Sequence, residues 1–271
     1  MIIVDQLDSI VFKVAEIASK PPDHIRLVLC MLLEMPIGLF LNVVVPPSWT
    51  MRYLYSMFMG LFLTAYMFRE QVYHIYLMSI GAYVLMTNMP RHSQHKYVLG
   101  FLIVYLSGQH IYVMMTDFGG YNMDVTTYTM LLMTKLWGLT FAYKDGAEPV
   151  EKLTKDQVER RVVQMPTLIQ YFSYVFFCCG CLMGPFFEFA DFVNWIQFTG
   201  NYKKLPRGLK NGWATLIPAL RRTFDGFLCL GIHLYFILGL GFSSSFVGLP
   251  EYATCGGFAY RMFYQFMAMT G

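Results

Sequence analysis

Apolar residues occur in long runs that short polar stretches separate along most of the chain. Five of these runs approach the length of about 20 residues that a helix needs to cross the hydrocarbon core of a bilayer. A proline pair at 46–47 separates the first two runs, and a polar stretch at 91–96 separates the third from the fourth. We predict spanning helices over these five ranges: 27–45, 51–68, 72–89, 97–116 and 125–143.

The first 20 residues show a different pattern, with apolar positions recurring at helical period. Five apolar residues share one face: Ile3, Leu7, Ile10, Val14 and Ile17. Five charged residues lie elsewhere on the helix: Asp5, Asp8, Lys13, Glu16 and Lys20. A helix of this kind is typical of a membrane interface. We therefore predict an interfacial amphipathic N-terminus over 1–24, followed by a multi-pass membrane domain over 25–271.

The second half of the chain is less regular. A polar stretch over 144–164 predicts a short surface helix, and the apolar run over 165–189 is interrupted by glycines and a proline. A basic stretch follows at 201–213, then a further spanning run at 224–247 and an apolar helix that begins at 258. We predict an all-α fold, a multi-pass transmembrane helical bundle.

Composition supports lipid as the surrounding solvent. Hydrophobic residues make up 56% of the chain and charged residues 14%, against roughly 25% charged in ordinary globular domains. The net charge of +3 is too small to suggest nucleic acid. The six cysteines lie in or beside apolar runs and lack the spacing of a zinc site, so we predict buried thiols, with palmitoylation as the alternative.

Basic residues indicate the orientation, because they favour the cytosolic side of a membrane. Alternating crossings place four basic residues on one side: Lys13, Lys20, Arg26 and Arg69. They place eight on the other: Arg52, Arg91, Lys96, Lys144, Lys152, Lys155, Arg160 and Arg161. We therefore predict a cytosolic location for the second group and a lumenal N-terminus without a cleavable signal peptide.

Ionisable residues inside the predicted spans are candidates for function, because they are costly in lipid. Glu34, His110, Lys135 and His233 are in this position. Each has a structural alternative: a hydrogen bond between helices, or a lysine whose ammonium group reaches the interface. A transporter would use such groups as a proton relay. No phosphate-binding glycine loop, GxSxG or HExxH motif occurs, so pattern alone indicates only a multi-pass membrane protein with polar groups at depth.

Three stretches carry a resemblance to a known family. They are Asp117-Phe118-Gly119-Gly120 with Asp124-Val125-Thr126, then Lys135-Leu136 through Phe141-Ala142-Tyr143, and finally Met165-Pro166-Thr167-Leu168 through Gly184-Pro185-Phe186-Phe187-Glu188-Phe189. In order and spacing they resemble the lysophospholipid acyltransferase branch of the membrane-bound O-acyltransferase (MBOAT) family, in its N-terminal part. Trp137-Gly138 and Thr127-Tyr128 depart from the pattern that we expect of that branch.

The resemblance implies transfer of an acyl chain from acyl-CoA to a lysophospholipid, in phospholipid remodelling at the endoplasmic reticulum. Acyl-CoA would be a co-substrate, and no cofactor and no metal are implied. The partners would be these two lipids and the bilayer. In enzymes of this kind the Gly-Pro-aromatic-acid segment lies beside the reaction chamber. The chamber candidates are therefore Gly184, Pro185, Phe186, Phe187, Glu188, Asp191 and His110.

The histidine and asparagine on which the family's chemistry depends are not found in their expected contexts. No Trp-His-Gly motif occurs, and the order at Asn194 and Trp195 is the reverse of the expected one. We therefore assign no catalytic residue and expect the chain to end before the catalytic half. The alternatives are a non-catalytic scaffold or lipid-binding remnant of such an enzyme and, as a third reading, a transporter.

Three roles are open for Glu188. It follows Pro185 by three residues, so its carboxylate could stabilise the first turn of a new helix. Alternatively it could pair at depth with Lys135, or remain solvated in an interfacial turn. Asp191, one turn further along, is expected at the membrane surface.

Overall fold

The computed structural model describes most of the chain. The described residues are 2–18, 21–46, 48–118, 124–182, 184, 186–204, 209–240, 252 and 256–269. Their regular elements are all helices, which confirms the all-α prediction. The chain divides into two compact units, Met1–Asn211 and Gly212–Gly271, and each is described by itself.

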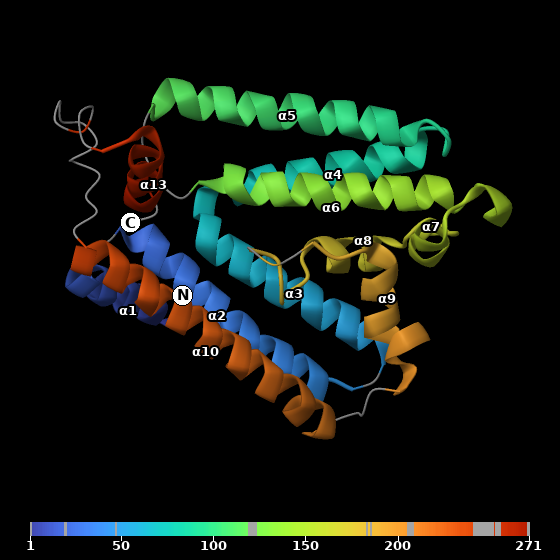
Figure 1. The fold of residues 1–271 in the computed structure, drawn as a ribbon. Coiled ribbons are helices and arrows are strands. Elements are labelled where there is room, and N and C mark those ends of the chain that lie inside the picture. Colours follow the sequence, from blue (N-terminus) through green and yellow to red (C-terminus); the bar gives the residue numbers. More distant parts are fainter. Residues whose placement is uncertain are drawn as a thin grey trace. The chain divides into compact units, whose positions relative to one another are not determined.

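In the first unit, the five ranges that we predicted as spanning helices are helical (Figure 1). Its α-helices are α1 (Ile2–Ala18), α2 (Pro22–Val43), α3 (Trp49–Phe68), α4 (Val72–Asn88), α5 (Gln94–Thr116), α6 (Val125–Asp145), α7 (Lys155–Arg160), α8 (Leu168–Val175) and α9 (Phe189–Gln197). Three short 3₁₀ helices are η1 (Arg69–Gln71), η2 (Val150–Lys152) and η3 (Gly200–Lys204). The second unit holds most of α10 (Leu209–Leu240), together with α13 (Phe258–Met269).

Local sequence explains where several of these helices begin. Pro22 occupies the first turn of α2, where a missing amide hydrogen costs nothing. The Asp124 side chain accepts from the Thr126 amide and caps α6. Capping boxes start α7 and α8, because Thr154 and Thr167 each exchange bonds with a glutamine three residues later. Within the range 144–164, where we predicted a short surface helix, the structure has the short helix α7, preceded by η2.

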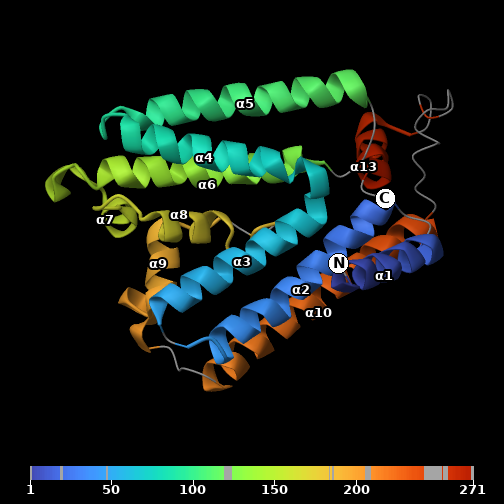
Figure 2. The same cartoon turned by 180° about the vertical axis from the view of Figure 1, so that it is seen from behind.

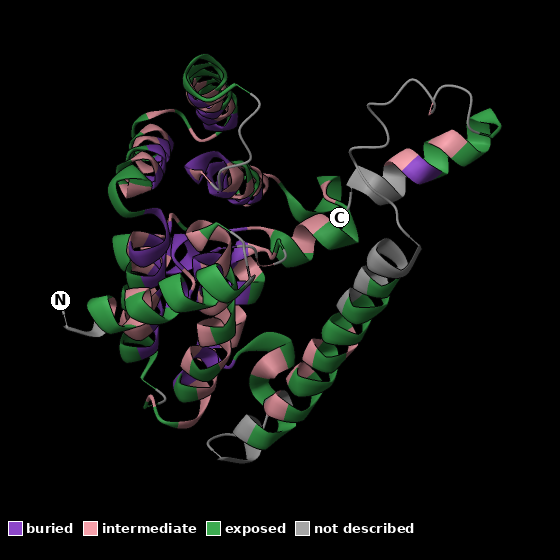
Figure 3. Cartoon of the chain, turned by 90° about the vertical axis from the view of Figure 1, so that its left-hand side faces the viewer, coloured by how far each residue is buried: buried purple, intermediate pink, exposed green. Residues whose placement is uncertain are grey.

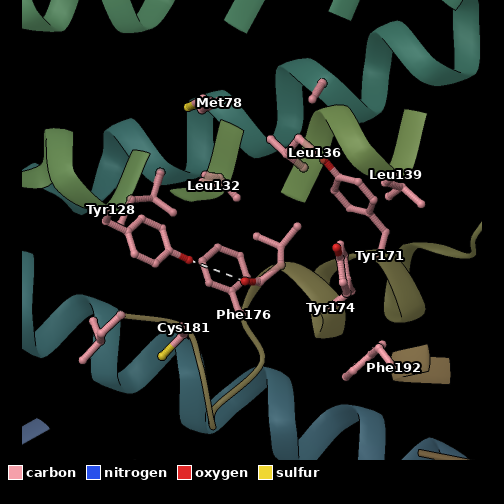
Figure 4. Packing of buried hydrophobic residues seen from close by; sticks show 14 of the residues in the cluster. Met78, Tyr128, Leu132, Leu136, Leu139, Tyr171, Tyr174, Phe176, Cys181 and Phe192 are labelled. Atoms are coloured by element: carbon pink, nitrogen blue, oxygen red, sulfur yellow. Dashed lines mark hydrogen bonds between the residues drawn. The ribbon is translucent and has the colours of Figure 1, made fainter. Parts of the chain in front are cut away.

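The core of the first unit is rich in aromatic side chains. Tyr171 and Tyr174 of α8 are fully buried, and leucines of α6, among them Leu132 and Leu136, are nearly so. Figure 4 shows these side chains meeting between the helices, together with Phe192 of α9. The Tyr171 hydroxyl donates to the Ser79 carbonyl on α4 over 2.8 Å, so α8 is held at the centre of the unit by packing and by a buried hydrogen bond.

Two arginines that we counted as cytosolic loop charges take part in this packing. Arg91, after α4, donates to the carbonyls of Tyr143 and Val162, both over 2.8 Å. Arg52 of α3 is 1% exposed, lies over the Trp195 ring and donates to a carbonyl of α2. Both therefore contribute to structure, and their sequence positions alone do not report membrane orientation.

Two described helices, α2 and α5, are long and apolar enough to cross a membrane by length and composition.

The buried residues gather where the helices of the first unit face one another (Figure 3), while many large apolar side chains stay exposed. Val104, Tyr112 and Met115 of α5 are between 67% and 82% exposed. Every described side chain of α10 is exposed or half-buried.

Candidate functional site

A buried loop joins α8 to α9, and we name residues 176–188 the core loop. Helix α8 ends at Val175 and α9 begins at Phe189, yet Phe176, Cys178 and Cys181 are at most 1% exposed. A Cβ atom added to Gly60 of α3 would overlap the Phe176 carbonyl oxygen. The absence of a side chain at residue 60 thus lets non-helical backbone enter the helix bundle.

Side chains satisfy the carbonyl groups at three points in or beside the core loop. The Lys135 ammonium group on α6 donates to the Gly180 carbonyl over 3.1 Å. The Tyr174 hydroxyl donates to the Phe187 carbonyl over 2.9 Å. The Tyr128 hydroxyl donates to the Val175 carbonyl over 3.5 Å, the bond drawn as a dashed line from Tyr128 in Figure 4. Buried backbone without a regular hydrogen-bond ladder is stable only when its polar groups find such partners.

Lys135 is the central group of this network. Its side chain is 5% exposed, and its ammonium nitrogen lies 4.6 Å from the centre of the Phe187 ring and 5.9 Å from that of Tyr174. Aromatic faces attract a desolvated cation. A carbonyl oxygen and two rings therefore hold the ammonium group inside the bundle.

Glu34 contacts the core loop from α2. The Cys181 thiol lies 3.7 Å from one Glu34 carboxylate oxygen, and the Cys179 thiol lies 4.0 Å from the Glu34 carbonyl. A Cβ atom on Gly38 would lie only 2.5 Å from the Cys179 sulfur. The core loop thus contacts an acid of α2 and a base of α6. The arrangement can fix the position of the loop, and the opposite charges of Glu34 and Lys135 attract each other across it.

Glu188 neither caps an amide of α9 nor pairs with Lys135. It is the residue before α9, but its side chain caps no amide there. One of its carboxylate oxygens lies 3.4 Å from a guanidinium nitrogen of Arg160 on α7. Lys135 instead bonds Gly180. The position of Glu188 at the start of α9 agrees with the expectation. The capping bond and the pairing with Lys135 are wrong, because the packing of α7 against α9 brings a surface arginine to the acid. Asp191 lies in the first turn of α9 and is exposed, and its place at the membrane surface stays a prediction.

The other residues of the Gly-Pro-aromatic segment are placed as follows. Gly184 lies so close to Gly180 that a Cβ atom would overlap it. Phe186 is 47% exposed, with its ring against Gly138 of α6. Phe187 packs edge-to-face on Tyr174, while Pro185 lies outside the described residues. Phe187 therefore touches the Lys135 network directly, whereas Phe186 contacts α6 at Gly138 and remains partly in the open.

His110 is half-buried on α5. None of the contacts of the core loop described above involves it. The neighbouring Gln109 is the buried residue, and it accepts a hydrogen bond from Thr129 of α6 over 2.9 Å. The side chain of His233, the other histidine singled out in the sequence, lies outside the described residues. Within the described part of the chain, no group of three or more His, Cys, Asp or Glu side chains could hold a metal ion.

Sequence reasoning found Glu34 and Lys135 separately and did not connect them. The signal that joins them is their opposite charge, in two segments that are otherwise apolar. The roles of Gly180, Cys179 and Cys181 were missed, since a carbonyl group and buried thiols leave no distinctive pattern in sequence.

Comparison with known proteins identifies the family. Residues 110–244 match the membrane-bound O-acyltransferase family. The chain belongs to this family. The matched region contains α6, α8, α9 and the core loop, whereas Glu34 of α2 lies before it. The family match therefore covers Lys135 and the loop, and Glu34 is a contribution of the preceding helices.

Curated relatives extend the similarity to most of the chain. Lysophospholipid acyltransferase 2 of Arabidopsis thaliana is 29% identical over 250 residues, which are 90% of this chain and 51% of that protein. Lysophospholipid acyltransferase of Schizosaccharomyces pombe is 28% identical over 86% of this chain and 45% of its own length. Human lysophospholipid acyltransferase 5 is 28% identical over 70% of this chain and 42% of its own length. The chain spans about half the length of the curated relatives that it matches.

The Arg160–Glu188 contact leads to a prediction for Glu188→Gln. Arg160 is 55% exposed in its side chain, and ion pairs near solvent contribute little, so the variant should change the free energy of unfolding by less than about 1 kcal/mol. Glu188 lies outside every helix of spanning length, and burial raises its pKa above the ordinary 4.5, with Arg160 lowering the pKa and Asp191 raising it. The folded state therefore binds the proton more tightly, and the wild type should lose stability as the pH rises through 4.5 and up to the raised pKa.

Thermal and denaturant unfolding of the detergent-solubilised protein between pH 4 and pH 8 checks this. The variant should lack this part of the pH dependence. The exposed Asp191→Asn should retain most of it, because burial is the larger cause of the raised pKa of Glu188. A severe loss of stability in Glu188→Gln that Lys135→Met reverses would contradict the surface pair and favour pairing at depth.

Proposed function

We propose that the enzyme containing this chain transfers an acyl chain from acyl-CoA to the free hydroxyl of a lysophospholipid. The observation that carries the proposal is the match of residues 110–244 to the MBOAT family, together with relatives that are named lysophospholipid acyltransferases. The family is membrane-bound, and the exposed apolar side chains of α5 suit a lipid surrounding.

The membrane arrangement is part of the proposal. The five helices α2 to α6 would cross the bilayer of the endoplasmic reticulum. Support comes from α2 and α5, which have the length and composition of spans, and from α3, α4 and α6, which pack with them in the same unit. A charge such as Arg52 is compatible with a spanning bundle because it is buried within protein.

In this enzyme the core loop would form a wall of the chamber in which the lipids react. Non-helical backbone at membrane depth is tolerated where it is enclosed by protein or borders a cavity. The Gly180 and Phe187 carbonyls are held by Lys135 and Tyr174, so the wall is fixed before substrate arrives. Such preorganisation reduces the cost of orienting a flexible lipid.

The chemical step would need a general base to take the proton of the lysophospholipid hydroxyl, and a polar group to polarise the reacting carbonyl. The sequence contains no Trp-His-Gly motif. We assign these two roles to the part of the enzyme that the 271 residues do not include. The 271-residue chain would then supply the lipid chamber wall without the base.

We expect the purified 271-residue chain to bind lysophospholipid but to form no acylated product. The chain in detergent is supplied with labelled acyl-CoA and a panel of lysophospholipids, and product is measured by chromatography. Binding is measured as a rise in melting temperature with added lysophospholipid, against a fatty acid of equal chain length. Turnover that His110→Ala abolishes would make His110 the base and overturn this division of roles. Equal stabilisation by both lipids, without turnover, would favour the non-catalytic scaffold.

A further inference from the structure

Helix α1 has three distinct faces. Val11 and Ala15 are at most 6% exposed and form the face that packs on the bundle. Polar residues occupy the opposite side and are exposed: Asp5, Ser9, Lys13 and Glu16. Between these faces runs an aliphatic stripe of Ile10, Val14 and Ile17, which are 52%, 42% and 86% exposed. The packing face and the aliphatic stripe are therefore different faces of the helix.

Ionic contacts fix the rotation of α1 about its axis. Asp8 accepts from the guanidinium group of Arg69 over 2.6 Å and from the Tyr66 hydroxyl over 3.2 Å. Arg26 of α2 approaches the same carboxylate to 3.7 Å. These partners lie at the end of α3, just after it, and near the start of α2. The aliphatic stripe consequently points in one fixed direction, away from the packing face.

The same contacts place α1 across one end of the bundle. Ten residues separate Asp8 from Ala18, where α1 ends. If α1 ran back along α2 as a hairpin, Asp8 would face a position about ten residues into α2. Its partner Arg26 is instead the fifth residue of α2. Figure 2 shows α1 beside the part of α2 that lies nearer its start.

Chain connectivity keeps α1 close to a membrane surface. Only three residues join Ala18 to Pro22, which allows at most about 14 Å between the two helix ends. Helix α2 is one of the two described helices that could cross a membrane. A helix with charged residues on one face that lies across the start of such a span belongs to the interfacial region.

We propose that α1 is an interfacial membrane helix whose aliphatic stripe of Ile10, Val14 and Ile17 inserts among the acyl chains of the bilayer, while its polar face remains in water. The stripe is continuous along two turns and contains no charge. Phe12, also exposed, lies on the other flank, with Asp8 and Glu16 one turn away on either side. The inference concerns membrane seating and is independent of acyl transfer.

Site-specific photocrosslinking tests the proposal in the full chain, with all native cysteines kept. A benzophenone amino acid replaces Ile10 or Ile17 in one pair of variants, and Ser9 or Glu16 in a matched pair from the polar face. Each variant is reconstituted into phosphatidylcholine nanodiscs and irradiated, and adducts are identified by mass. We expect phospholipid adducts at Ile10 and Ile17 to exceed those at Ser9 and Glu16 by about tenfold.

Three results would overturn the proposal. Crosslinks from Ile17 to a second copy of the chain would show that protein covers the stripe. Equal lipid labelling at all four positions would show that α1 has no fixed orientation, and no lipid adduct at any position would place the helix in water. Gel filtration and the melting temperature of each variant confirm that the chain is folded before irradiation. Asp8→Asn, which weakens the contact to Arg69, should reduce the difference between the two faces.

Discussion

Lys135→Met should lower the free energy of unfolding by about 2 kcal/mol, within the range for lost hydrogen bonds to charged groups. Methionine matches the lysine stem in length but cannot donate to the Gly180 carbonyl, which lies 3.1 Å from the ammonium group. It also leaves Glu34 without the cation that partly balances its charge. Methionine also removes the desolvation cost of burying an ammonium group, and this gain offsets part of the loss. The expected cost is therefore not larger.

A matched control distinguishes the effect of breaking the Lys135 network from the effect of replacing a lysine at all. Lys96 is exposed on α5, so Lys96→Met should change the free energy of unfolding by less than about 0.5 kcal/mol. Combining Lys135→Met with Glu34→Gln should cost less than the sum of the single changes, by about 1 kcal/mol. Denaturant unfolding of the detergent-solubilised variants measures all four values. If the free-energy changes of Lys135→Met and Glu34→Gln simply add in the double variant, the core loop does not couple the two residues.

Gly60→Ala should destabilise the protein by about 1–3 kcal/mol, the usual cost of overfilling a packed core. The new methyl group would overlap the Phe176 carbonyl oxygen, which belongs to backbone and cannot rotate away. Gly100 of α5 is the control, because a Cβ atom there meets nothing within 4 Å. Gly100→Ala should stabilise by up to about 1 kcal/mol through helix propensity. A lower melting temperature for Gly60→Ala and a higher one for Gly100→Ala would confirm the close approach. A change in the same direction for both variants would contradict it.

The helices could be predicted from sequence because their patterns are long and local. The ranges 51–68 and 72–89 agree with α3 and α4 to within two residues at each end. We predicted five membrane-spanning helices from sequence. Among the described helices, only α2 and α5 have the length and hydropathy of a membrane span. The role of Arg52 could not be predicted, since its packing against Trp195 joins positions more than 140 residues apart.

The candidate site was only partly visible in sequence for the same reason. The resemblance pointed to the Gly-Pro-aromatic segment, and the rarity of charge in apolar runs pointed to Lys135 and Glu34. Their common attachment to the core loop depends on three segments that are distant in the chain. The partner of Glu188 depends on the packing of α7 on α9, for which the sequence of either helix alone provides no signal.

The way in which the core loop is held also determines how it can come loose. At Gly180 and Phe187, backbone carbonyls of the loop are bonded by side chains of α6 and α8 and not by a repeating ladder of their own. Release of these few bonds would free the segment as one cooperative unit while the surrounding helices stay folded. Its buried thiols Cys178 and Cys181 would then become accessible to alkylation together. Their modification rate would report the local opening equilibrium of the loop, separately from global unfolding.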